Sequence, residues 1–288
     1  MKIIYSEKAA EYNVPGHPEA PFRVLKTKEY LEKTGAQFVK PNYAKEKDIL
    51  SAHTGELLNL VKSENFSDAD TPAFKGVYEN AMLSAGAAID ASDYALKNEF
   101  AFSLMRPPGH HAGRNSLGGF CYFNNIAVAV KHLLSDAKAS ATSQPKIAIL
   151  DIDVHHGNGT QDIFLGVENV IYVSLHQIPL YPGTGHSSEK NCFNFPLSAG
   201  CDEASYLKTL DAAIEKIVKF SPKVVGISAG FDTYQGDPLA NLKLKKDSYK
   251  KIAKKIAEIK AGKFAILEGG YSQDLPELIG NFLEGIGC

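Results

Sequence analysis

The stretch that decides the fold is KIAILDIDVHHGNGTQ, residues 146–161. Its first five residues, 146–150, are apolar after the initial lysine, and two Asp, two His and turn-forming Gly and Asn follow at once. Because consecutive rather than alternate positions are apolar, the run predicts a strand buried on both faces of a sheet. The polar cluster then lies at the carboxyl end of that strand, where open α/β sheets bind their ligands.

Runs of the same kind recur along the chain. Short apolar segments suited to buried strands occupy residues 2–5, 100–104, 170–175, 223–227 and 263–267. Segments suited to helices lie between them, at 77–96, 125–134, 203–219, 248–261 and 275–283. This alternation predicts an α/β fold with a mainly parallel sheet covered by helices on both faces.

No repeat or linker divides the chain, so residues 1–288 are expected to form a single domain. Residues 135–145 predict a surface loop before a strand. Residues 176–200 predict a second loop, whose length favours a functional role over a simple connection.

The composition excludes several classes of protein. The chain has 31 basic and 33 acidic residues and a formal net charge of −2, which gives no whole-chain case for a basic nucleic-acid or membrane binder. Four scattered Cys argue against a disulfide scaffold and a thiolate zinc site. We find no apolar run of about 18 residues and no signal peptide. A cytoplasmic protein without nucleic-acid or membrane partners is expected, and its oligomeric state stays open.

Polar clusters follow four of the other predicted strands as well. These clusters are RPPGHH at 106–111, His176, SAGFD at 228–232 and EGGY at 268–271. Since the carboxyl ends of parallel strands share one edge of a sheet, we expect all of them to meet there.

Three of these side chains suit a metal ion. Asp153 and His155 are two positions apart at a strand end, so they point to the same side, and Asp232 supplies a third ligand from another strand. Two carboxylates and one imidazole suit Zn²⁺, with Fe²⁺ as the alternative. Three protein ligands leave positions for water and substrate, which is typical of a catalytic site. Taken singly, an Asp such as Asp151 or Asp153 is more often a helix cap or a loop residue than a metal ligand.

The pair His110 and His111 follows two prolines and a glycine, which fix both rings. Imidazole both takes and returns a proton near neutral pH, so the pair suits acid–base catalysis, whereas a lone buried His is more often a core residue. Tyr271 follows two glycines and suits a donor to a developing oxyanion.

Together, these residues resemble the zinc-dependent histone deacetylase family, which includes acetoin-utilisation proteins and acetylpolyamine amidohydrolases. The resemblance runs from about residue 15 to 285 and is carried by motifs in family order: RPPGHHA (106–112), GFCYFNN (119–125), DIDVHHGNGTQ (151–161), SLH (174–176), YPGTG (181–185), SAGFD (228–232) and EGGY (268–271). It implies the arginase/deacetylase fold with about eight strands. It also implies a zinc-dependent hydrolase of amide C–N bonds.

The resemblance assigns a role to each motif residue. Asp153, His155 and Asp232 would hold the zinc. The other catalytic residues would be His111 as general base and then acid, His110 paired with Asp151, Tyr271 at the oxyanion, and Asn158 as partner of His111. Class I enzymes carry Asp at the last position, so Asn158 matches the class II and prokaryotic pattern.

Further residues are implied around the substrate and at structural ions. The substrate residues would be Gly119, Phe120, Tyr181, Leu239, Gly269 and Asp70, with Arg23 near an inner acetate pocket. Asp70 reads equally as a turn residue. Structural K⁺ would bind at Asp151, Asp153, His155, Ser174 and Leu175, and a second K⁺ at the carbonyls of Phe164 and Val170.

Four functions stay open on this basis. The leading one removes acetyl or other acyl groups from lysine side chains of proteins or peptides, because the uncharged Leu239 stands where a polyamine-selective branch carries Glu. The second is a deacetylase of acetylpolyamines or other small acetylated amines. The third is an arginase-like ureohydrolase with two Mn²⁺, which is disfavoured because this sequence lacks the further bridging carboxylates that such a site needs. The fourth is a protein that binds acylated ligands without hydrolysing them. It would not explain why His110, His111, Tyr271 and all three metal ligands are present.

Overall fold

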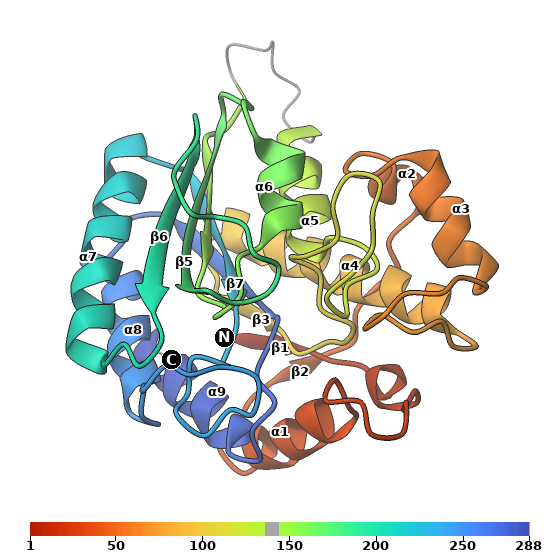
Figure 1. The fold of residues 1–288 in the computed structure, drawn as a ribbon, viewed down its shortest axis with the longest axis horizontal. Coiled ribbons are helices and arrows are strands. Elements are labelled where there is room, and N and C mark those ends of the chain that lie inside the picture. The colour runs from red at the N-terminus through yellow and green to blue at the C-terminus, as the bar shows by residue number, and fades with distance from the viewer. Residues whose placement is uncertain (136–143, 288) are drawn as a thin grey trace.

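The computed structural model describes residues 1–135 and 144–287 of the chain. Its strands are β1 Lys2–Ile4, β2 Phe38–Val39, β3 Ala101–Ser103, β4 Ile147–Asp151, β5 Val170–Ile178, β6 Cys192–Ser198, β7 Val224–Ala229 and β8 Gly262–Leu267. They form one eight-stranded sheet in the order β2-β1-β3-β8-β7-β4-β5-β6, and every pairing is parallel (Figure 1). The predicted α/β fold with a parallel sheet is thereby confirmed.

Helices cover both faces of this sheet (Figure 1). They are the 3₁₀ helix η1 Glu7–Ala10, and α1 Phe22–Glu32, α2 Glu46–Ile49, α3 Gly55–Ser63, α4 Val77–Leu96, α5 Asn125–Ser135, α6 Asn158–Phe164, α7 Glu203–Phe220, α8 Ser248–Ala257 and α9 Leu275–Gly285. Helices α4 and α5 pack together against one face, whereas α7, α8, α9 and α1 follow one another as neighbours on the other face.

The central strands are buried as their sequences predict. All five residues of β4 and all six of β7 are buried, which requires cover on both faces. Helix α4 carries a stripe of small buried residues, Ala81, Ala85 and Ala88, so it can approach the sheet closely. The Asp202 side chain accepts a hydrogen bond from the backbone N–H of Ser205 and caps the start of α7.

Two strands escape the sequence analysis, and both lie at sheet edges. Strand β2 is only two residues long. Strand β6 lies inside 176–200, so the prediction of one continuous loop there is wrong: β5 extends to Ile178 and β6 begins at Cys192. The residues of β6 alternate between buried and more exposed and include Pro196, as suits an edge strand but not a buried one. The predicted loop at 135–145 and the predicted domain's last residue, 288, fall largely outside the described residues.

The strand order explains why the polar clusters meet. The five strands that precede them, β3, β8, β7, β4 and β5, are adjacent in the sheet. The chain builds β1 to β3 on one side and β4 to β6 on the other, and β7 and β8 then fill the gap. Such a change in the direction of strand order opens a crevice at the carboxyl edge.

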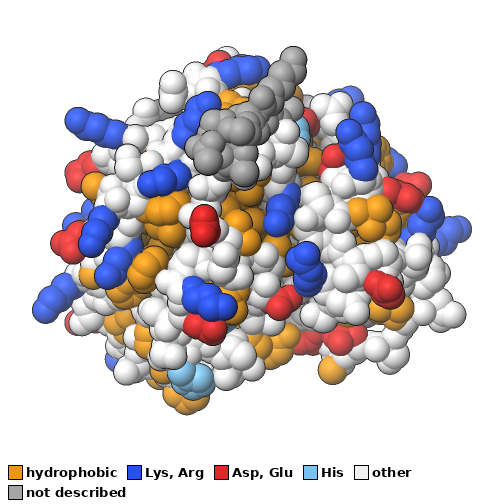
Figure 2. Space-filling view, turned by 90° about the horizontal axis from the view of Figure 1, so that it is seen from above, with side chains coloured by type: hydrophobic (Ala, Val, Ile, Leu, Met, Phe, Trp, Pro, Cys, Tyr) orange, Lys and Arg blue, Asp and Glu red, His pale blue; other side chains and the backbone are white. Residues whose placement is uncertain are grey.

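The face shown in Figure 2 carries Lys and Arg side chains spread among Asp and Glu rather than gathered into one patch, which agrees with the near-zero net charge of the chain. Among the described residues, no helix is both long and apolar enough to cross a membrane.

The packing of α4 generates a test of the fold. A Cβ added to Gly86 would lie 2.6 Å from the backbone nitrogen of Ala44 and 2.8 Å from the carbonyl carbon of Tyr43. We therefore expect Gly86→Ala to destabilise the protein by about 1–3 kcal/mol through overpacking, although Gly→Ala in a helix ordinarily stabilises by about 1 kcal/mol. Urea unfolding measures the difference. Gly55→Ala, at the start of α3 with nothing within 4 Å of the new carbon, is the control and should be neutral or stabilising. A stabilised Gly86→Ala would contradict this packing.

Candidate active site

A cavity of about 260 Å³ opens at the carboxyl edge of the central strands. It is lined by Asp70, Pro108, His110, His111, Gly119, Phe120, His155, Leu180, Tyr181, Leu239, Gly269 and Tyr271. All of these except Pro108 and Leu180 are residues that the sequence analysis places at the site. Asp151, Asp153, Asp232 and Asn158 lie beneath the lining and contact it through hydrogen bonds.

Three ligand atoms converge at the floor of the cavity. Nδ1 of His155 lies 3.1 Å from Oδ1 of Asp153 and 3.1 Å from Oδ2 of Asp232. The second oxygen of each carboxylate is held by a backbone N–H: Gly269 donates to Asp153 at 2.7 Å, and Val154 donates to Asp232 at 2.8 Å. Each carboxylate therefore keeps one oxygen directed at the shared centre.

This geometry fits a divalent metal ion. One ring nitrogen carries at most one hydrogen, so His155 cannot donate to both carboxylates at once. Tetrahedral coordination with bonds of about 2.0–2.1 Å places ligand atoms about 3.3 Å apart, close to the spacing here. Burial and the charge of Asp153 raise the pKa of Asp232 to about 7, so the paired carboxylates call for a cation between them. The cluster Asp153, His155 and Asp232 is a buried candidate metal site.

The pKa values of the two neighbouring histidines, His110 and His111, are shifted in opposite directions. Nδ1 of His110 lies 3.1 Å from Oδ2 of Asp151, and Nδ1 of His111 lies 2.8 Å from the side-chain oxygen of Asn158. Burial alone would lower the pKa of His110, but the charges of Asp153 and Asp151 outweigh it and raise this pKa to about 10. Burial, together with the positive charges of His110 and His155, lowers the pKa of His111 well below its usual range. Although the two rings are in contact, His110 is thereby favoured in its charged form and His111 in its neutral form.

One carboxylate that the sequence analysis leaves without a role holds this histidine loop. Oε2 of the buried Glu268 accepts hydrogen bonds from the backbone N–H groups of Gly109 at 2.7 Å and His110 at 3.2 Å. Its Oε1 accepts from the hydroxyl of Ser228 at 3.0 Å. Glu268 stands first in the EGGY motif, and that position was the only signal of its function.

Tyr271 lies at the inner end of the cavity and is 9% exposed. Its backbone N–H donates to Asp237 at 2.7 Å, and its ring meets that of Phe120 edge-on with centroids 5.8 Å apart. Among the described residues, no hydrogen bond engages its hydroxyl. The phenol is therefore positioned by its backbone and ring and keeps its donor for a ligand.

Aromatic rings form the cavity walls. Phe120 and the 45% exposed Tyr181 both line the cavity, and the ring centroid of Tyr181 lies 5.0 Å from that of His111. Phe120 adopts a left-handed conformation with φ 70°. Its N–H donates to the hydroxyl of Thr71 at 2.9 Å, while the N–H of Gly119 donates to Asp70 at 3.0 Å. Asp70 thus lines the cavity and holds the backbone of Gly119 through one carboxylate oxygen.

Arg23 does not line the cavity. Its guanidinium donates to the carbonyls of Gly270, at 2.7 Å, and Glu268, so it supports the Tyr271 loop from beneath. Glu19 accepts from Arg23 and from Arg106, and all three side chains are buried. Although burial opposes ionisation, the charges of the two arginines lower the pKa of Glu19 to about 2.

The two sets of residues implied for K⁺ differ in their hydrogen bonding. Among the described residues, no donor reaches the backbone carbonyls of Asp153 and His155. In contrast, the carbonyls of Phe164 and Val170 accept hydrogen bonds from the side-chain amide of Asn191. The second set therefore does not fit a bound ion.

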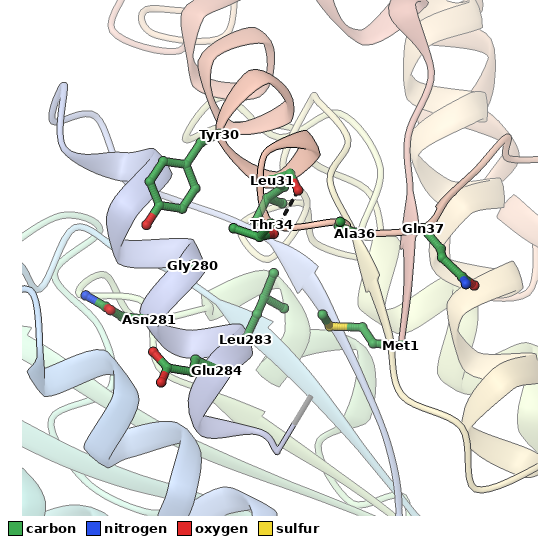
Figure 3. A pocket seen from close by; sticks show the side chains of 11 residues that line it. Met1, Tyr30, Leu31, Thr34, Ala36, Gln37, Gly280, Asn281, Leu283 and Glu284 are labelled. Atoms are coloured by element: carbon green, nitrogen blue, oxygen red, sulfur yellow. Dashed lines mark hydrogen bonds between the residues drawn. The ribbon is translucent and has the colours of Figure 1, made fainter.

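A second cavity, of about 490 Å³, lies on the opposite edge between Met1, α1 and α9 (Figure 3). Met1 and Gln37 directly precede β1 and β2, so this is the amino edge of the sheet. Glu284 is its one charged side chain and already pairs with Lys250. Among the described residues of this lining, there is no cluster of catalytic or metal-binding groups, so this cavity is not a candidate site.

Comparison with known proteins agrees with the geometry of the site. The sequence profile of the histone deacetylase domain matches residues 17–285. The chain belongs to the histone deacetylase family. The predicted family and the predicted amide-bond hydrolase are thereby confirmed, and the metal dependence of the family agrees with the buried Asp–His–Asp cluster.

Two of the relatives and one solved structure each match most of the chain. A probable deacetylase of Archaeoglobus fulgidus is 36% identical, and the match covers 94% of this chain and 80% of that protein. Acetylpolyamine amidohydrolase 2 of Pseudomonas aeruginosa is also 36% identical, over 71% of this chain and 61% of that enzyme. The crystal structure of the HDA15 HD domain superposes with a TM-score of 0.91 at 30% identity, covering 100% of this chain and 91% of that one.

The buried charges beneath the Tyr271 loop generate a prediction about acid stability. We expect Glu19→Gln to destabilise the protein by about 3–5 kcal/mol at neutral pH, because it leaves two buried arginines without their carboxylate. A carboxyl group with a lowered folded pKa stabilises above its unfolded value and loses that contribution as pH falls. The wild type should therefore lose the Glu19 contribution as pH falls from 4.5 toward 2, and the gap to the variant should close over that window.

Urea unfolding at a series of pH values measures this gap. Glu29→Gln is the matched control, since Glu29 pairs with Lys26 at the surface with 56% of its side chain exposed. It should cost much less stability than Glu19→Gln, because an exposed ion pair contributes little. Equal losses for the two variants would contradict the assignment.

Proposed function

We propose that this histone deacetylase family member removes acetyl or other acyl groups from lysine side chains of peptides or proteins. The observation that carries the proposal is the arrangement of one cavity. Aromatic walls lead past an uncharged rim residue, Leu239, to His111, Tyr271 and the Asp–His–Asp cluster. A channel of this kind suits the long methylene stem of an acyl-lysine, with the amide at its inner end.

Asp153, His155 and Asp232 would hold the metal, which we propose to be Zn²⁺ with Fe²⁺ as the alternative. When bound, such an ion polarises the acyl carbonyl and activates water. The backbone N–H groups of Gly269 and Val154 orient the two carboxylates, so the ligands are held ready by the protein itself.

His111 would act as general base and then as general acid. The oxygen of Asn158 accepts from Nδ1–H of His111, which leaves the lone pair of Nε2 for the reacting water. Because its pKa lies well below the usual range, His111 is neutral at neutral pH and can take a proton. It then returns that proton to the nitrogen of the leaving amine.

His110 and Tyr271 would support the developing charge. The pKa of His110 is raised to about 10, so this ring stays protonated beside Asp151 and provides a fixed positive charge. The hydroxyl of Tyr271 would donate to the oxygen of the tetrahedral intermediate. Phe120 and Tyr181 would exclude water around the stem of the substrate.

One structural K⁺ belongs to the proposal. It would lie among Asp151, Ser174, the carbonyl of Leu175, and the carbonyls of Asp153 and His155. The absence of any hydrogen-bond donor to the last two carbonyls, among the described residues, supports a cation there.

A deacetylase of small acetylated amines is the second candidate, and Asp70 is the observation that favours it. This carboxylate lines the cavity, and only Oδ1 accepts from Gly119 and Thr71. Its other oxygen is available to an ammonium group. The relatives at 36% identity carry names of both kinds, so overall similarity does not separate the two substrates.

A turnover panel separates these substrates. We expect acetyl-lysine peptides to have a higher kcat/KM than acetylspermidine or acetylputrescine, because Leu239 presents no charge to a second amine. Leu239→Glu should shift the ratio toward the polyamines by about three- to tenfold, the effect of one partly exposed ion pair. Leu239→Gln controls for size and polarity. Exclusive turnover of the polyamines by the wild type would overturn the leading proposal in favour of the second.

The pH dependence tests the role of His111. The acid limb of kcat/KM should lie below the ordinary imidazole value of 6.5, because the pKa of His111 is lowered. Asn158→Asp adds a negative charge beside the ring, favours its protonated form, and should move that limb upward by about one to two pH units. Asn194→Asp, which adds the same charge without contacting His111, is the control. An unchanged profile for Asn158→Asp would count against His111 as the base.

A further inference from the structure

Asn191 stands immediately before β6 and joins three carbonyl groups of the segment that connects α6 to β5. Its side-chain nitrogen lies 2.8 Å from the carbonyl oxygen of Phe164, 3.3 Å from that of Val167 and 2.9 Å from that of Val170. Its side-chain oxygen accepts from the N–H of Gly166 at 2.6 Å. Both ends of one amide thus bind the same short segment.

Carbonyl oxygens that converge on one point need a positive partner, because their dipoles repel one another. A cation supplies that partner from solution, whereas an NH₂ group supplies it from the chain. An amide nitrogen has two hydrogens, which match the two short contacts to Phe164 and Val170. The third oxygen, of Val167, lies farther away but on the same nitrogen.

We propose that the side-chain amide of Asn191 replaces the second structural K⁺ that the family resemblance implies at Phe164 and Val170. The segment between α6 and β5 is then held by a covalent part of the protein and requires no ion. The contrast with the first K⁺ position supports this assignment, because the carbonyls of Asp153 and His155 receive no donor from the described residues.

The replacement also links the segment to the edge of the sheet. The backbone carbonyl of Asn191 accepts from the N–H of Tyr172 in β5 at 3.1 Å, so the same residue pairs with the strand and closes the preceding loop. Tyr172 in turn donates to Asp151, the partner of His110. Asn191 is therefore connected by two hydrogen bonds, through Tyr172, to Asp151 beside His110.

Asn191→Ala tests the proposal by removing the amide and leaving the carbonyls. This variant should melt at a lower temperature than the wild type in choline chloride. Replacing choline by K⁺ at equal ionic strength should restore about 2–4 °C beyond any gain of the wild type, as expected for an ion that binds only the folded state. Asn194→Ala is the matched control, since Asn194 lies three residues farther along, in β6, and donates to Gln161 and Ser187 but not to these carbonyls. It should lose stability without a K⁺-specific recovery.

A second measurement uses the wild type and does not depend on the variant folding. Crystals grown with Tl⁺ as a substitute for K⁺ should show anomalous density near Asp151 and Ser174 and none among the carbonyls of Phe164, Val167 and Val170. Density at the latter three would overturn the replacement, as would an Asn191→Ala variant whose melting responds to K⁺ no more than the wild type does.

Discussion

The site depends on one repeated interaction, in which a buried carboxylate after one strand accepts a hydrogen bond from a backbone N–H in the loop after another strand. Glu268 after β8 holds Gly109 after β3, Asp153 after β4 holds Gly269 after β8, and Asp232 after β7 holds Val154 after β4. Asp237 holds Tyr271 in the same way. Each bond satisfies a charge that burial would otherwise penalise, and together they lock four loops into one rigid edge.

This interlocking explains how the same residue types serve two purposes. In Asp153 and Asp232, one oxygen is used for the neighbouring loop and the other is directed at the metal position. The protein therefore orients its ligands without adding further side chains. It also keeps His111 and Tyr271 at fixed positions in the lining of the same cavity.

The sequence predicts what depends on local pattern and position along a strand. Continuous apolar runs locate the central strands, and residues such as Asp153 and His111 stand directly after them, so their meeting at one edge follows from parallel pairing. Strand β6 is lost because an edge strand alternates and tolerates Pro196. Asp237 and Asn191 escape notice for another reason: their partners are backbone groups, so no local pattern marks them. Glu19 escapes notice because its second arginine, Arg106, lies 87 residues away in sequence.

The strand order has a consequence for the growing chain. Strands β7 and β8 are made last but lie at the centre of the sheet, between the half that contains β3 and the half that contains β4. Asp232 and Tyr271 arrive with them, and Arg23 meets the carbonyl of Gly270 only then. A chain that ends before β7 therefore lacks the two strands that join the halves of the sheet. It also lacks the metal ligand Asp232 and the cavity residues Gly269 and Tyr271, so the site is complete only once the last strands are inserted.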